Sequence, residues 1–325
     1  MRNDRRRYRR RRHLQRDSRG VVSVVGTLLS LLVFFALFGI FLTEYVPVWM
    51  TENESQWSTA AQTSMAQLQS SLEQQIAFGS PPTFATTFNL QSQGIPLFAQ
   101  GTQGSLTFLG AAYYSTLNLS THPGYQETPF VFLKIAYPGV AKPLWANYST
   151  GFVSMNLPNR YYSAQTIQLE DDAVIVSQTA TNQYIAYPPF ISLTQTSGNF
   201  SVAMEVTQLT GNSTSSSYAG TQDMYSHLIG AAPVTFNNSS AVAGFTGGLT
   251  ITMGVYTHFP CAWWGLFNQT VARAGLTSPV VATIANSGCV SQTSAMVPVS
   301  LTLTDVTSFS YIRGEVRLTT GVGAS

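Results

Sequence analysis

The sequence predicts a mainly β protein with a long N-terminal α-helix, a lollipop-like arrangement in which one β-sandwich or two packed β-sandwiches carry one short inserted helix. Three observations predict it: a charge-free apolar run, a helical apolar stripe behind it, and apolar–polar alternation of period two from about residue 83. The chain accordingly divides into a basic cytoplasmic leader (1–20), a transmembrane helix (21–43), an amphipathic stalk helix (44–78), a Pro/Gly linker (79–86) and an extracellular β-sandwich region (87–325).

Charge is scarce and unevenly placed. Only 9% of the 325 residues are charged, whereas globular domains carry about 25%. Ten arginines lie within the first 20 residues, and the remainder holds 6 basic and 12 acidic residues. Because the body has no basic patch, we expect no nucleic-acid partner. A surface with so few carboxylates also predicts a body that keeps its fold in acid.

Residues 21–43 contain no charged side chain and, as a helix, span about 34 Å, enough for the hydrocarbon core of a bilayer. The arginine-rich flank predicts a cytoplasmic N-terminus and an external body, with membrane lipid as the first partner. A secretory signal peptide is disfavoured, because the run exceeds its usual length and no small-x-small cleavage site follows.

The string Arg19-Gly20-Val21-Val22-Ser23-Val24-Val25-Gly26-Thr27 resembles the junction of archaeal type IV pilin-like proteins, which carry a class III signal peptide. The family form V-S-P-V-V-G-T is matched at Val24–Thr27 and not at Val22 and Ser23. The resemblance implies cleavage between Gly20 and Val21 by a prepilin-type peptidase. It also implies homo- or hetero-oligomers formed through the N-terminal helix. The alternative is an uncleaved signal anchor with the same topology and no filament.

The stalk has its own helix signals. Thr51–Glu54 fits the capping-box pattern and predicts a helix start, while Gly79–Pro82 predicts the end. Pro47 predicts a kink or a break. One face carries an apolar stripe that packs either on the protein's own β region or on neighbouring helices: Trp57, Ala61, Met65, Leu68, Leu72 and Ile76.

Alternation predicts strands over 104–109, 130–137, 151–156, 164–169, 172–178, 183–187, 200–206, 249–255, 297–304 and 308–318. Residues 262–274 predict the inserted helix, and Gly275 its end. Glu170-Asp171-Asp172 predicts a hairpin loop rather than a cation site, since no matching ligand spacing follows.

Two features indicate export. The even cysteine count predicts a disulfide between Cys261 and Cys289, with a zinc site that adds His227 and His258 as the weaker alternative. N-x-S/T sequons, all beyond the apolar run, offer N-glycosylation at Asn53, Asn118, Asn147, Asn199, Asn212, Asn237, Asn238 and Asn268.

No catalytic motif occurs, so we expect no enzyme, no cofactor and no metal. The first functional hypothesis is a pilin-like subunit with a structural or adhesive role. The second is a monomeric tethered protein that binds a partner or, through aromatic pairs such as Tyr161-Tyr162 and Trp263-Trp264, a glycan. The third is a glycosidase, which needs two of the carboxylates among Glu127, Glu170, Asp171, Asp172, Glu205 and Asp223.

Overall fold

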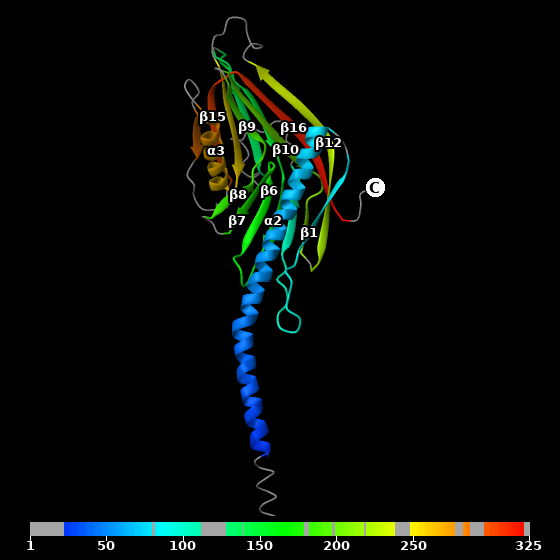
Figure 1. Cartoon of the computed structure of the whole chain (residues 1–325). Helices are drawn as coiled ribbons and strands as arrows, with labels where there is room; N and C mark the ends of the chain where they lie inside the picture. The colour runs from blue at the N-terminus through cyan, green and yellow to red at the C-terminus, as the bar shows by residue number, and fades with distance from the viewer. Residues whose placement is uncertain are drawn as a thin grey trace, which may run out of the picture.

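The computed structural model describes residues 23–79, 82–111, 128–138, 140–178, 182–196, 199–217, 219–237, 248–276, 282–286 and 296–321. One helix, Ser23–Phe78, runs into a body made of three sheets and a second, short helix. Figure 1 shows the first part of this helix projecting below the body and its second part, α2 (Val46–Phe78), lying against it. The predicted fold class, mainly β with one long and one short helix, is confirmed.

The long helix does not break at Pro47. Proline lacks the N–H that an α-helix needs and its ring crowds the carbonyl one turn earlier. A π-helical turn, η1 (Phe41–Tyr45), immediately precedes α2 and widens the helix there. The capping-box prediction at Thr51–Glu54 was wrong, because these residues are helical on both sides and the Thr51 hydroxyl donates to the Pro47 carbonyl, 2.9 Å away. Gly79, in the left-handed conformation, ends α2.

The body contains three sheets, each with its own strand order. The first has the order β1-β12-β16-β10-β9, with β10 and β16 parallel, the second β11-β2-β5-β6-β7-β8, and the third β14-β15-β13-β3-β4. Their bounds are β1 Phe84–Asn89, β2 Ser105–Leu109, β3 Phe130–Ala136, β4 Leu144–Ser149, β5 Phe152–Leu157, β6 Gln165–Glu170, β7 Ala173–Ser177, β8 Gln183–Tyr187, β9 Ile191–Thr196, β10 Asn199–Thr210, β11 Thr214–Ser216, β12 Thr221–Asn237, β13 Leu249–Thr257, β14 Ala282–Asn286, β15 Val297–Val306 and β16 Ser308–Thr320.

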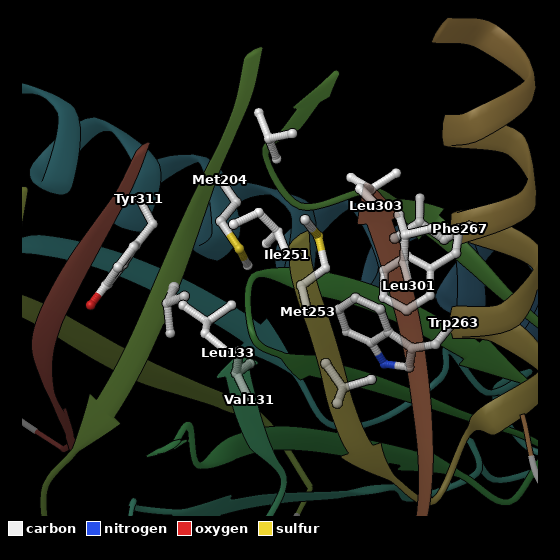
Figure 2. Packing of buried hydrophobic residues seen from close by; sticks show 14 of the residues in the cluster. Val131, Leu133, Met204, Ile251, Met253, Trp263, Phe267, Leu301, Leu303 and Tyr311 are labelled. Carbon is white, nitrogen blue, oxygen red and sulfur yellow. The ribbon is translucent and has the colours of Figure 1, made fainter. Parts of the chain in front are cut away.

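The apolar stripe of α2 packs on the protein's own sheets. All six predicted stripe residues are buried, and they join side chains of the first and second sheets in one core cluster. A second cluster lies between the third sheet, the first sheet and α3 (Pro260–Ala274). Figure 2 shows Trp263 and Phe267 of α3 pointing toward Leu301 of β15 and Met253 of β13. The body therefore has two cores, of which only one contains α2.

The apolar–polar alternation predicted ten of the strands to within a few residues. It did not predict six others: β1, β4, β9, β11, β12 and β14. The 17-residue β12 contains Gly230 and Pro233, which argue against a strand. β1 pairs with the first part of β12, up to Ser226. Among the described residues, the part that contains Pro233 therefore pairs with β16 on one side and has no neighbour on the other, where the missing N–H of proline is tolerated. Asp171 and Asp172 form the predicted hairpin turn, both with positive φ.

Candidate membrane-proximal surface

The first part of the long helix has an uncovered apolar surface. We call residues 23–45 the anchor segment. Its large apolar side chains are exposed, for example Leu32 at 67% and Leu37 at 63%, and the helix is long and apolar enough to cross a membrane. A continuous apolar surface of this size is normally covered by lipid or by another protein. The change from exposed to buried begins at Val46, where α2 reaches the body.

Aromatic rings line one side of this segment and continue past its end. Phe34, Phe38, Phe41, Tyr45 and Trp49 follow one another at helical spacing, with successive ring centroids 5.9, 6.5, 5.9 and 6.4 Å apart. Tyr45 and Trp49 are exposed where the segment meets the body. Amphipathic rings in this position are typical of a membrane–water interface.

A loop from the body reaches the same side of the helix. We call residues 91–103 the tip loop; it follows β1 and is drawn beside the helix in Figure 1. Bridges between Gln91 and Gln103 and between Ile95 and Ala99 hold its two limbs together. At its end, the Phe98 ring contacts the rings of Phe38 and Phe41, with centroids 6.2 and 5.7 Å apart.

Glu54 of α2 connects the tip loop and a second loop, around residues 160–162, to the helix. Its fully buried carboxylate accepts hydrogen bonds from the Thr102 hydroxyl at 2.5 Å and from the backbone N–H groups of Tyr161 and Tyr162, both at 2.7 Å. The Arg160 N–H lies 3.1 Å from both carboxylate oxygens. Burial would raise the pKa of Glu54, but these donors together lower it. An ionised side chain of α2 therefore fastens two loops to the helix.

A second group of buried carboxyls lies higher on α2. Asp171 and Asp172 in the β6–β7 turn and Glu205 of β10 are at most 7% exposed, and Glu73 of α2 faces them. Within the described part of the chain, neither Asp172 oxygen has a hydrogen-bond partner. Burial, then the charges of Glu205, Glu73 and Asp171, and finally the close approach of the Glu73 carboxyl group, raise the pKa of Asp172. Burial, then Glu73, raises the pKa of Glu205 to about 7.

Glu170 is buried beside this group but is well satisfied. It accepts hydrogen bonds from the Thr257 hydroxyl, from Trp263 Nε1 at 2.7 Å and from Gln168 Nε2 at 2.9 Å. Of the six carboxylates considered for a glycosidase, Glu170, Asp171, Asp172 and Glu205 are thus buried, and Glu127 lies outside the described residues. Asp223 is half-buried and accepts a hydrogen bond from Thr87. Among the described residues, no group of three or more His, Cys, Asp or Glu is arranged to hold a metal ion.

The asparagines of the sequons differ in how exposed they are and in whether the side-chain nitrogen donates a hydrogen bond. Asn147, Asn199, Asn212 and Asn237 are exposed. Asn53 and Asn268 are half-buried, and each uses its side-chain nitrogen to donate to a backbone carbonyl, of Gln93 and Trp264 respectively. Asn118 and Asn238 lie outside the described residues. If sugars are attached, we expect them first at the four exposed sites.

Cys261, the second residue of α3, is disulfide-bonded, and its predicted partner Cys289 lies outside the described residues, as do Gly20 and Val21 of the predicted processing site. A disulfide sulfur is not a thiolate ligand, so Cys261 is not free to join His258 in the zinc alternative. His227 instead lies on β12 and contacts the Thr83 hydroxyl.

The tip loop and the role of Glu54 were not predicted from the sequence. The local signal for the loop was a short apolar run, 95–99, between Gly94 and Gly101. Glu54 had no such signal, because its donors lie far away along the chain: Thr102 is 48 residues later and the Tyr161 N–H is 107 residues later. Comparisons of this chain with protein-family models, curated proteins and solved structures gave no match.

Proposed function

We propose that this chain is a single-pass cell-surface protein of the archaeal type IV pilin-like kind, with its N-terminus inside and its β-rich body outside. Its role is structural or adhesive, as for a minor filament subunit. Its partners are membrane lipid, a prepilin-type peptidase and other subunits that pack against the anchor segment.

The observation that supports this proposal is the division of one helix between two environments. The anchor segment presents bare apolar side chains, whereas the stripe from Trp57 to Ile76 is buried in the protein's own core. A helix that is buried over one half and bare over the other suits a protein that is held in a membrane and carries its body outside. The arginine-rich leader is the argument for the orientation.

The second candidate is an uncleaved, monomeric tethered protein that binds a partner or a glycan. Exposed aromatic side chains favour it: Tyr161 is 44% and Trp264 43% exposed, although Trp263 belongs to the core. Flat aromatic faces open to solvent are a common means of contact with sugars and proteins.

The test is the N-terminal residue of the protein extracted from native membranes, read by peptide mass spectrometry. The pilin-like proposal expects a chain that begins at Val21. A chain that begins at Met1 with its arginines intact would overturn it and leave the tethered surface protein.

A further inference from the structure

The end of the tip loop combines two features that a purely structural loop would avoid. The Leu97 side chain is completely exposed, at 101% of its reference area, and Phe98 is 42% exposed. Leu97 also has a φ of 70°, a conformation that non-glycine residues rarely adopt. Strain and full exposure of a leucine at one position point to a functional constraint on that residue.

The tip loop is hydrogen-bonded to α2. Asn53 Nδ2 donates to the Gln93 carbonyl at 3.0 Å, and Thr102 donates to Glu54. The limbs approach so closely that a Cβ on Gly101 would lie 1.9 Å from the Ser92 carbonyl oxygen, so only glycine fits. These contacts place the tip loop beside α2.

The tip lies level with the anchor segment. The Phe98 ring contacts Phe38 and Phe41, which are five and two residues before Thr43, the last residue of the charge-free run. At 1.5 Å per residue, the ring lies about 3 to 8 Å below the end of that run. Interfacial apolar groups enter a bilayer to a similar depth, about 5–10 Å.

A positively charged side chain, that of Arg160, lies on the body side of the tip loop. A hollow of about 1000 Å³ is lined by the tip loop together with Pro158 and Arg160. Arg160 is exposed, and it is one of only six basic residues beyond the leader. An apolar tip with a guanidinium above it matches the order of layers in a lipid leaflet, acyl chains and then phosphate groups.

We infer that the tip loop is a second membrane contact. Leu97 and Phe98 enter the outer leaflet beside the anchor segment, and the Arg160 guanidinium contacts lipid phosphate groups. Two contacts at a fixed spacing hold the body in one orientation on the membrane. The inference rests on the proposed membrane anchor, and it commits to lipid because lipid would surround the anchor segment at this level.

The test measures depth with spin labels on the full chain in phosphatidylcholine vesicles at a high lipid-to-protein ratio. A label at Leu97→Cys should collide often with oxygen and rarely with an aqueous nickel complex, as a label in the interface does. Leu144→Cys is the matched control, since Leu144 is also an exposed leucine, at 50%, but lies on β4 of the third sheet. Phe34→Cys reports on the anchor segment itself.

The outcomes separate the inference from the proposed function. Lipid-like readings at both Phe34→Cys and Leu97→Cys support the second contact. A lipid-like Phe34→Cys with a Leu97→Cys as aqueous as Leu144→Cys overturns the inference and leaves the anchor. An aqueous Phe34→Cys overturns the proposed function itself. A Leu97→Cys label that becomes aqueous when protein is diluted in lipid also overturns the inference, because a neighbouring copy then covered it.

Arg160→Gln tests the phosphate contact separately. The backbone N–H of residue 160 still reaches Glu54, so the loop keeps its place. The Leu97→Cys label should move toward the surface while Phe34→Cys keeps its depth. An unchanged Leu97→Cys depth would overturn the contact between Arg160 and phosphate.

Discussion

Helix α2 contributes to two groups of buried carboxyl side chains, and the free-energy cost of burying a carboxylate is offset in a different way in each. Glu54 remains ionised because one hydroxyl and three backbone N–H groups surround it. Higher on the helix, Glu73 meets Asp171, Asp172 and Glu205, where the charges that act on Asp172 are all carboxylates. Donors can satisfy a buried charge, whereas burial and neighbouring carboxylates raise the pKa values of Asp172 and Glu205 and so favour their protonated forms.

The difference has a structural meaning. The Glu54 site lies where two loops must be fixed against the helix close to the anchor segment, and charge-assisted hydrogen bonds are strong and directional. The upper group lies between α2, the β6–β7 turn and β10, where packing already fixes the elements. The first site fixes the position of two loops, and the two sites make stability depend on pH in opposite senses.

Removal of the Glu54 charge should have the largest effect. Glu54→Gln keeps the size but replaces one acceptor oxygen by a donor that faces the N–H groups of Tyr161 and Tyr162. The free energy of unfolding at pH 7, measured by denaturant titration in detergent, should fall by about 2–3 kcal/mol. Glu52→Gln, at an exposed position two residues earlier, should change it by less than about 0.5 kcal/mol.

An equal effect of Glu54→Gln and Glu52→Gln would contradict the role of Glu54. Its pH dependence gives a second check. Because its folded pKa is lowered, the stabilisation by Glu54 is present above the unfolded pKa and is lost as pH falls through the folded pKa. The Glu54→Gln variant should therefore lose less stability than the native chain in strong acid.

The upper group should behave in the opposite sense. The folded pKa of Glu205 is raised to about 7, so its stabilisation is full below the unfolded pKa near 4.5 and is lost as pH rises toward 7 and above. Glu205→Gln, a neutral mimic of the protonated acid, should raise the free energy of unfolding at pH 8 by about 1–2 kcal/mol and flatten the profile between pH 5 and 8.

Glu315→Gln is the control for this prediction, because Glu315 lies on β16, the strand next to β10. It should leave the profile between pH 5 and 8 unchanged. A native chain whose stability rises steadily from pH 5 to pH 8 would show that the upper group holds no proton. A native chain that unfolds steeply between pH 5 and pH 3 would contradict the predicted acid tolerance of the body.

The sequence predicts well what short-range patterns control. The α2 stripe, ten strands and the Asp171-Asp172 turn each follow from local spacing or local turn chemistry. The two carboxyl environments do not, because each joins elements far apart in the chain, as Glu54 joins Tyr162 and Asp172 joins Glu73. The capping-box pattern at Thr51–Glu54 was even misleading, since the same glutamate serves a distant loop rather than its own helix end.

The smallest predicted effect separates the Glu54 site from the tip loop that depends on it. Thr102→Val removes one hydroxyl donor to Glu54 but leaves the three N–H groups in place. The free energy of unfolding at pH 7 should fall by about 1–1.5 kcal/mol in denaturant titration. Thr107→Val on β2, where the hydroxyl contacts the exposed Ser215 hydroxyl, should lower the free energy of unfolding by less. In the Glu54→Gln background, Thr102→Val should lower the free energy of unfolding by less than it does in the native chain, because the two residues share one hydrogen bond. Additive losses would mean that Thr102 stabilises the tip loop without Glu54, and packing and the hydrogen bond from Asn53 to the Gln93 carbonyl would then hold that loop to the helix.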